Sequence, residues 1–265
     1  MGDHDEALGF ALELAELGGR IAMGHFGTAL RSEQKADGTW VTEADWAVEA
    51  QIRLRIARSF PDHNVFGEEE GLTAAGGGQA RPGAPTWVID PIDGTNNYKA
   101  GIPIWATLVA LQIDGASVAG VAHAPALGET YEGALGSGAR FNGTPMTTDP
   151  LSSLAEATVL YAGVKGFADA GLRAFFSDLT SRCWRSRGFG DFWGHMLVAR
   201  GAAHVMVEPE LALWDVAALQ PIVSEAGGKM THLDGRPWSE SGSVLTTNDS
   251  LHGQVVFLFA EHHPA

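Results

Sequence analysis

The sequence predicts an α+β protein folded as one compact unit, and three observations support this fold class. Apolar residues recur at helical spacing through much of the first 60 positions. Short apolar runs separated by turn residues occupy positions 105–142, as in an antiparallel meander. Beyond Asp149-Pro150, strand and helix patterns alternate, which is typical of an α/β arrangement with its own sheet. We therefore expect an N-terminal α+β half at residues 1–149 and a C-terminal α/β half at residues 150–265.

Two helices are expected at the start of the chain. Residues 4–26 carry apolar side chains every three or four positions with acids early, which indicates an amphipathic helix. After a polar loop at residues 31–38, Thr42 is the expected N-cap of a second helix that Phe60-Pro61 ends. Asp45 falls at the third position of that helix, where an acid completes a capping box. Capping is therefore the structural alternative to a catalytic role for Asp45.

The expected strands are short and bounded by turn residues. In the first half they cover residues 64–67, 87–90, 105–113, 117–124, 130–134 and 138–142. In the second half, strands at 158–161, 183–186 and 204–208 alternate with helices at 170–180, 190–199 and 213–226, before a last helix at 248–261. The Gly- and Ala-rich residues 72–85 are expected to form a mobile surface loop, which could also move as a lid.

Charge and cysteine content exclude several classes of protein. The formal net charge is −15, from 17 Lys and Arg against 32 Asp and Glu. Such a chain repels nucleic acid and anionic membranes, so neither is an expected partner. The single cysteine, Cys183, excludes an intramolecular disulfide framework and fits a reducing compartment. We see neither a basic, apolar leader nor an apolar run of about 18 residues, so we expect a cytoplasmic protein.

The most informative stretch is a pair of aspartates that follows an apolar strand. Asp90 ends the strand, a proline starts a turn, and Asp93 comes three positions after Asp90. Mg²⁺ prefers oxygen ligands, so the two carboxylates and the carbonyl of Ile92 form a candidate metal site. The amides of Gly94 and Thr95, at the start of an expected helix, face the same space and attract phosphate. Asp-Pro and Asp-Gly are also ordinary turn formers, which is the structural alternative.

Two further acidic motifs flank this pair, Gly67-Glu68-Glu69 before it and Trp214-Asp215 after it. Taken alone, Glu68 belongs to a solvated turn and Asp215 is a first-turn acid of a helix. Together with the hexapeptide at 90–95 they resemble the inositol monophosphatase family of Mg²⁺-dependent, lithium-sensitive phosphatases, in order and spacing across essentially the whole chain. The resemblance implies a layered αβαβα sandwich of the inositol monophosphatase and fructose-1,6-bisphosphatase type.

The resemblance also implies roles for single residues. It assigns the binding of two or three Mg²⁺ to Glu68, Asp90, the carbonyl of Ile92, Asp93 and Asp215. Asp45 and Thr95 match the pair that orients and deprotonates an attacking water, with Glu68 beside them in the catalytic group. No covalent nucleophile is needed, because metal ions neutralise the charge of a phosphate monoester and activate the water.

The segment that faces the leaving group departs from the inositol-specific pattern. Gly190-Asp191-Phe192-Trp193 is bulkier and more acidic, and with Glu208 it resembles the histidinol-phosphate phosphatases of this family, whose substrate carries an amine and an imidazole. Two acids would bind the amine and an aromatic ring would contact the imidazole. A first-turn acid and a core face of aromatics are the structural alternatives. The expected substrate-binding set is Asp93, Gly190, Asp191, Phe192, Glu208 and Asp215.

We therefore expect a Mg²⁺-dependent histidinol-phosphatase of histidine biosynthesis, whose partner is a small phosphate monoester. An inositol-1-phosphate or broader sugar-phosphate phosphatase is the first alternative. A non-catalytic module that binds metal or phosphate is an alternative from another class, although every acid of the motifs is present. The resemblance further implies a homodimer. Among the histidines, His195 is the candidate for a place near the pocket, because it lies one helical turn beyond Asp191.

Overall fold

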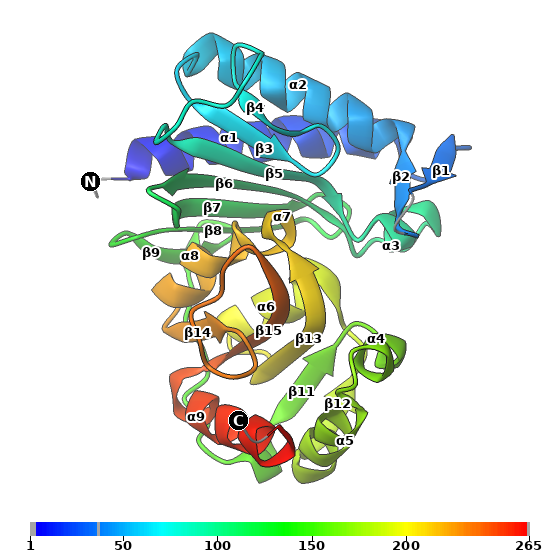
Figure 1. The fold of residues 1–265 in the computed structure, drawn as a ribbon, viewed down its shortest axis with the longest axis vertical. Coiled ribbons are helices and arrows are strands. Elements are labelled where there is room, and N and C mark those ends of the chain that lie inside the picture. The colour runs from blue at the N-terminus through cyan, green and yellow to red at the C-terminus, as the bar shows by residue number, and fades with distance from the viewer. Residues whose placement is uncertain (1–3, 36–37, 264–265) are drawn as a thin grey trace.

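The computed structural model describes residues 4–35 and 38–263, whose helices and strands stack in five layers (Figure 1). The first layer is α1 (Asp5–His25) and α2 (Glu43–Ser59), which cover one face of an eight-stranded sheet. The middle layer is α6 (Asp191–Ala199), α7 (Leu213–Val216) and α8 (Leu219–Glu225), between that sheet and a five-stranded one. The last layer is α4 (Val164–Asp169), α5 (Arg173–Arg182) and α9 (Asp249–His262). The expected αβαβα sandwich is confirmed.

The eight-stranded sheet has the order β10-β9-β8-β7-β6-β5-β3-β4 and is antiparallel except between β3 and β5. Its strands are β3 (Asn64–Gly67), β4 (Gly71–Ala74), β5 (Thr86–Asp93), β6 (Ala106–Ile113), β7 (Ala116–Ala124), β8 (Glu129–Ala134), β9 (Gly138–Phe141) and β10 (Thr144–Pro145). The expected meander is therefore confirmed. A five-residue helix, α3 (Thr95–Lys99), follows β5.

The five-stranded sheet has the order β12-β11-β13-β15-β14, with parallel pairs on both sides of β11. Its strands are β11 (Thr158–Tyr161), β12 (Arg185–Arg187), β13 (Val205–Ala212), β14 (Gly228–Thr231) and β15 (Ser241–Asn248). The middle core contains side chains from both predicted halves, such as Leu108 and Phe192. The two halves therefore share one interior, and the boundary at Asp149-Pro150 stays a prediction.

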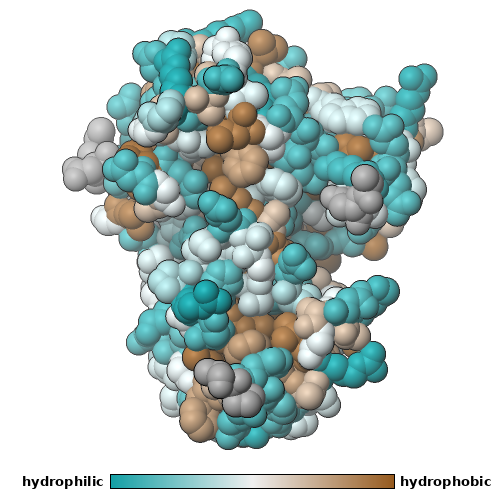
Figure 2. All heavy atoms as spheres, in the orientation of Figure 1, coloured by the Kyte–Doolittle hydropathy of each residue, from teal (hydrophilic) through white to brown (hydrophobic). Residues whose placement is uncertain are grey.

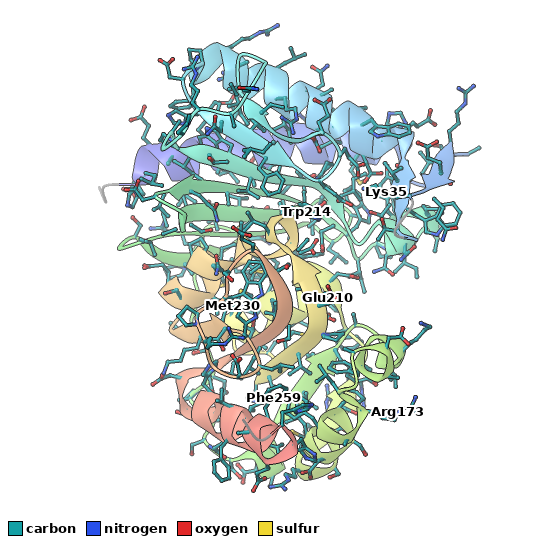
Figure 3. The ribbon with its side chains drawn as sticks, in the orientation of Figure 1. Lys35, Arg173, Glu210, Trp214, Met230 and Phe259 are labelled. Carbon is teal, nitrogen blue, oxygen red and sulfur yellow. The ribbon has the colours of Figure 1, made fainter. Side chains whose placement is uncertain are left out.

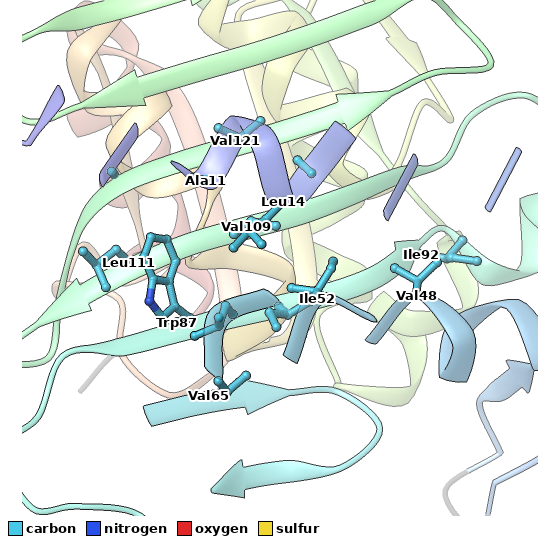
Figure 4. Packing of buried hydrophobic residues seen from close by; sticks show 14 of the residues in the cluster. Ala11, Leu14, Val48, Ile52, Val65, Trp87, Ile92, Val109, Leu111 and Val121 are labelled. Atoms are coloured by element: carbon cyan, nitrogen blue, oxygen red, sulfur yellow. The ribbon is translucent and has the colours of Figure 1, made fainter. Parts of the chain in front are cut away.

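The helical layer above the large sheet is set by the periodic apolar residues of α1 and α2. Leu14 and Ile52 are fully buried and belong to the same core as Trp87 of β5 and Val109 of β6 (Figure 4). The expected capping box starts α2, because the backbone N–H of Thr42 donates to the Oδ2 atom of a first-turn aspartate at 2.8 Å. The same core contains Val48 near the start of α2 and Ile92 near the end of β5.

Several local predictions were wrong. The predicted polar loop at residues 31–38 instead contributes β1 (Ser32–Gln34), which pairs with β2 (Trp40–Thr42) in a hairpin. The predicted helix at 213–226 is broken into α7 and α8, because Pro221 has no N–H to donate back along a continuous helix. The second half also contains α4, β14 and β15, none of which the sequence patterns indicated.

The Gly- and Ala-rich segment also differs from its prediction as a loop. Its first residues form β4, and Ala74 lies opposite Asn64, at the end of β3 away from Glu68. Residues 75–85 then return to Thr86, which also pairs with Asn64. This segment therefore lies at the other end of the sheet and does not cover the acidic residues. Within the described ranges, no helix is long and apolar enough to cross a membrane.

Candidate active site

A β-bulge makes Asp90 and Asp93 face the same space. The two residues are three steps apart on β5, but their partners on β6 are only two steps apart. In a regular strand, residues three apart point to opposite faces, and one extra residue in a bulge reverses this. Thr107 Oγ1 of β6 donates to the carbonyl of Pro91 at 2.9 Å, which satisfies one backbone group of the bulge. The Asp-Pro step therefore bends a strand, whereas the sequence indicated a turn.

Asp215 reaches the same place from the other half of the chain. The ring of Trp214 contacts the ring of Phe66 edge-on at a centroid distance of 5.6 Å, which packs α7 against β3. Figure 3 shows Trp214 at this junction of the two halves. Carboxylate oxygens of Asp90, Asp93 and Asp215 all lie within 4.8 Å of one another. The fold thus brings together three acids that the sequence places up to 125 positions apart (215 − 90).

These acids line a cavity of about 220 Å³. Its lining includes the predicted residues Glu68, Asp90, Ile92, Asp93, Gly94, Thr95, Asp191, Phe192 and Asp215. It also includes Thr39, Trp40, Asn96, His195, Leu211 and Leu219, of which the sequence indicated only His195. Figure 2 shows a hollow at the right-hand edge, where the β1–β2 hairpin and α3 of the upper half face α4 of the lower half.

The acid cluster is electrostatically unfavourable without a cation. Burial, followed by the charges of Glu68, Asp93 and Asp215, raises the pKa of Asp90 well above its usual range. Burial and the neighbouring carboxylates raise the pKa of Asp93 in the same way. Burial raises the pKa of Asp215 to about 7, although the N–H of Ala212 opposes the shift. A divalent cation offsets both the burial of the carboxylates and the repulsion between them. These oxygen donors therefore fit Mg²⁺.

One oxygen of Asp90 gives independent support for this fit. Its Oδ1 atom is buried and has no hydrogen-bond partner among the residues that the structure describes. A buried carboxylate oxygen without a donor costs free energy, and a metal ion would satisfy it. The geometry of the donors therefore matches the chemistry of a hard cation.

Glu68 already has a positively charged neighbour, which the sequence did not indicate. Lys35 Nζ lies 2.8 Å from an oxygen of Glu68 and 2.8 Å from an oxygen of Glu69. Burial alone would lower the pKa of Lys35, but the hydrogen bonds to both glutamates outweigh burial and raise it. Figure 3 shows Lys35 near the β1–β2 hairpin. Nothing in the polar loop pattern pointed to this residue, because its partners come from the β3–β4 turn.

Asp45 lies beside the cluster but not on the cavity surface. Its Oδ2 atom accepts hydrogen bonds from the N–H and the Oγ1 of Thr42, at 2.8 and 2.6 Å. Its Oδ1 atom is buried without a partner in the described part of the chain, and burial raises the pKa of Asp45 to about 6. Thr95 Oγ1 donates to the carbonyl of Ile92 at 3.0 Å. No described hydrogen bond joins Asp45 to Thr95, so their joint catalytic role stays a prediction.

The N-terminus of α6 is tied directly to the acid cluster. The N–H of Phe192 donates to Asp93 Oδ2 at 2.8 Å, and Asn97 Nδ2 donates to Asp191 Oδ2 at 2.9 Å. Asp191 has a φ of +55°, a conformation that Asp and Asn tolerate better than most residues. Phe192 is fully buried and forms part of the cavity wall. The structure thus places one acid and one aromatic ring in the same cavity as the cluster of Asp90, Asp93 and Asp215.

Other predicted substrate residues lie behind this wall. Glu208 is 4% exposed, and burial, followed by the charges of Asp191 and Asp215, raises its pKa well above its usual range, although the backbone of Ala162 and Asp191 opposes the shift. A Cβ on Gly190 would lie 2.3 Å from the Cβ of Ala162, so glycine is needed for close packing there. Trp193, the alternative ring, points elsewhere, because its Nε1 donates to a glutamate on β8 at 3.0 Å. Direct substrate contact by Glu208 and Gly190 stays a prediction.

His195 is a titratable side chain of the cavity wall that burial keeps neutral. It is fully buried, and burial lowers its pKa to about 3. Its Nδ1 atom lies 2.8 Å from Thr246 Oγ1 of β15, whereas Nε2 has no hydrogen-bond partner among the described residues. The prediction from helical spacing that His195 lies near the pocket is therefore confirmed.

Comparison with known proteins now identifies the family. A sequence profile described as the inositol monophosphatase family matches residues 3–263. The chain belongs to the inositol monophosphatase family. It is 42% identical over 267 residues to a histidinol-phosphatase of Streptomyces coelicolor, covering 97% of each chain. It is 40% identical over 259 residues to a histidinol-phosphatase of Mycobacterium tuberculosis, covering 96% of this chain and 97% of the other.

A solved structure of an inositol monophosphatase from Zymomonas mobilis has a TM-score of 0.86 and 28% identity to this chain, covering 97% of this chain and 99% of the other. The family and the fold that the sequence motifs predicted are both confirmed. As a member of the inositol monophosphatase family with the acid cluster in its cavity, the protein is a phosphate monoester hydrolase.

Proposed function

We propose that the protein is a Mg²⁺-dependent histidinol-phosphatase, which converts L-histidinol phosphate and water to L-histidinol and phosphate. The observation that carries the proposal is the shared cavity of the acid cluster with Asp191 and Phe192. The acids suit a phosphate and its metal ions, whereas one carboxylate and one ring suit an amine and an imidazole. The relatives that bear the name histidinol-phosphatase support the same substrate.

In this proposal Glu68, Asp90, Asp93, Asp215 and the carbonyl of Ile92 hold two or three Mg²⁺. The metal, when bound, supplies positive charge that offsets the phosphate dianion and makes a water a stronger nucleophile. The protein's own residues position the reactants for an in-line attack of that water on phosphorus.

Three residues act on the phosphate end. Gly94 and Thr95 line the cavity, and in this proposal their backbone amides donate to phosphate oxygens. Thr95 Oγ1, which bonds a backbone carbonyl in this structure, is the group that orients the attacking water. Among the described residues, Asp45 Oδ1 has no hydrogen-bond partner, and burial raises the pKa of Asp45 to about 6, so it suits the role of proton acceptor near neutral pH.

The leaving-group end distinguishes histidinol from neutral alcohols. Asp191 is held by Asn97 and accepts a hydrogen bond from the substrate ammonium, while Phe192 packs against the apolar part of the substrate. Glu208 lies directly behind Asp191 and adds negative charge without lining the cavity. Burying two acids side by side is unfavourable unless a cation pairs with them, so a cationic substrate gains affinity here.

The proposal includes finer properties. The family resemblance implies inhibition by lithium, a homodimer and a place in histidine biosynthesis, and the single cysteine fits a reducing, cytoplasmic location. Each has its own direct assay, and none of them is needed for the substrate assignment.

The test is phosphate release from L-histidinol phosphate and from myo-inositol 1-phosphate, with MgCl2, in wild type and in Asp191→Asn. Asparagine is the appropriate replacement because residue 191 has a positive φ that alanine tolerates poorly. We expect kcat/KM to favour histidinol phosphate in wild type, and Asp191→Asn to lower it about 10- to 100-fold for that substrate only. An equal loss on both substrates contradicts the proposed specificity.

A broader inositol- or sugar-phosphate phosphatase is the second candidate, and the match to the Zymomonas mobilis inositol monophosphatase favours it. The same assay separates the two functions, because a broad enzyme would hydrolyse both substrates with similar kcat/KM. Absence of Mg²⁺-dependent phosphate release from any substrate would instead favour a non-catalytic binding module.

A further inference from the structure

The turn between β3 and β4, which carries Glu68, is held by a buried carboxylate outside the cavity. Glu49 lies on α2, one helical turn after Asp45, and is 1% exposed. Its Oε2 atom accepts the backbone N–H of Glu69 at 2.9 Å, and its Oε1 atom accepts the N–H of Glu70 at 3.0 Å. One carboxylate thus binds two successive amides of the turn, directly after the residue predicted to bind metal.

Arg53 completes this arrangement one turn further along α2. Its Nε atom donates to Glu49 Oε1 at 2.8 Å, so the buried charge is paired. Its two terminal nitrogens donate to Thr73 Oγ1 at 3.0 Å and to the carbonyl of Gly71 at 2.6 Å, both on β4. The ion pair therefore contacts the turn and the strand that follows it, which limits motion of the turn on both sides.

Gly67 shows how closely the carboxylate fits. A Cβ at this position would lie 2.2 Å from Glu49 Oε1 and 2.6 Å from Oε2, so the carboxylate occupies the place of a side chain. On the opposite side, the N–H of Glu68 donates to the carbonyl of Ile89 at 3.2 Å. The backbone of Glu68 is therefore fixed between β5, which continues to Asp90, and the carboxylate of Glu49.

We propose that Glu49 is a positioning residue for the metal centre, with Arg53 as its partner. It orders the turn so that Glu68 lines the same cavity as Asp90 and Asp215. A turn without this clamp would lose conformational entropy when Glu68 binds metal, so the metal would bind more weakly. The inference rests on the proposed metal-dependent function and adds a residue that touches neither metal nor substrate.

The test compares wild type with Glu49→Gln, which keeps the shape of the side chain. Its amide group would place an N–H donor against a backbone N–H group of the turn and would remove the buried charged partner of Arg53, leaving the carboxylate of Glu70 at 3.6 Å from Nε. Calorimetric titration of the metal-free protein with MgCl2 should give a Kd about tenfold higher than in wild type. The MgCl2 concentration for half-maximal phosphate release should rise in parallel, with kcat at saturating MgCl2 close to that of wild type.

A second readout needs no metal. Hydrogen exchange of at least one of the Glu69 and Glu70 amides in the metal-free protein should be faster in Glu49→Gln, because glutamine keeps only one acceptor oxygen for two N–H groups that now use two. Ile52→Val is the matched control, since Ile52 is a fully buried core residue of the same helix. It should lower stability without changing the Kd for Mg²⁺ or the exchange of these two amides.

The outcomes separate the inference from the proposed function. A wild-type protein that binds no Mg²⁺ overturns both. Wild-type affinity in Glu49→Gln overturns the positioning role alone, and so does an equal loss of affinity in Ile52→Val. Should Glu49→Gln fail to fold, Arg53→Lys tests the same idea, because it retains the charge but loses the hydrogen bonds to β4. A smaller increase in Kd supports the inference, and an unchanged Kd overturns it.

Discussion

The two ends of the cavity are both acidic, but their carboxylates are satisfied in different ways. At one end, oxygens of Asp90, Asp93 and Asp215 face one another within 4.8 Å. At the other end, Asp191 accepts a hydrogen bond from the amide of Asn97, and Glu208 lies behind it, outside the cavity lining. The first arrangement needs multivalent cations, whereas the second needs at most a single positive charge. Reactivity and substrate preference should therefore respond separately to mutation.

The largest expected effect comes from removing one carboxylate of the cluster formed by Asp90, Asp93 and Asp215. Asp93→Asn should lower kcat/KM by about 10³-fold or more, because several kcal/mol of charge stabilisation depend on the metal. The same change should raise the Tm of the metal-free protein, since burial and the carboxylates of Asp191 and Asp215 already disfavour the charged form of Asp93. Asp114→Asn, in the β6–β7 turn, is a control that should change neither quantity. Retention of a tenth of the activity would contradict the role of Asp93.

His195 tests whether the wall between the two ends can carry positive charge. Its pKa is about 3 in the folded protein and about 6.5 when unfolded, so protons bind preferentially to the unfolded state. Its contribution to stability is complete above pH 6.5 and is lost as the pH falls, by about 2 kcal/mol at pH 5. Wild type should therefore lose more stability than His195→Gln between pH 8 and pH 5, measured by urea unfolding of metal-free protein. Parallel losses would show that His195 titrates normally.

Glu208→Gln should affect only the leaving-group end. Removing this charge behind Asp191 should raise KM for histidinol phosphate about tenfold and change hydrolysis of inositol 1-phosphate less than about twofold. Glu210→Gln is the matched control, because Glu210 is exposed two residues further along β13. A fall in kcat on both substrates would mean that Glu208 acts in catalysis, as the acid cluster does, and not in recognition of the leaving group.

The smallest expected effect concerns Lys35, which donates a hydrogen bond to Glu68. Its ammonium group occupies an oxygen of Glu68 that a metal would also use, so the two cations compete. Lys35→Gln should therefore lower the MgCl2 concentration for half-maximal activity by about threefold, as for loss of a partly exposed ion pair. Lys165→Gln, which removes an exposed pair with Asp169, should leave it unchanged. A higher MgCl2 requirement in Lys35→Gln would mean that Lys35 orders Glu68 and does not compete with metal.

Glu68 and Asp191 also differ in how neighbouring residues hold them in place. Its turn is clamped by an ion pair on α2, whereas Asp191 is held by one hydrogen bond from Asn97. We expect metal affinity to depend on interactions far from the cavity surface. Substrate preference should depend on the few groups at the start of α6.

The sequence alone determined the elements and the candidate acids, because both depend on short-range patterns. Apolar spacing fixed α1 and α2, Thr42 marked a helix start, and the hexapeptide at 90–95 marked the metal-type pair. The single helix at 213–226 was predicted wrongly, because the local signal of Pro221 was overlooked. The hairpin β1–β2 was missed because a three-residue strand leaves a weak periodic signal.

Tertiary structure decided which groups meet. Asn97 and Asp191 are 94 positions apart, Lys35 and Glu68 are 33 apart, and no local pattern relates either pair. Asp90 and Asp93 point to the same side of β5 because the pairing of β5 with β6 contains a bulge with one extra residue. Periodicity reports which face of an element is apolar, but hydrogen bonds and charges between distant elements exist only after those faces have packed together.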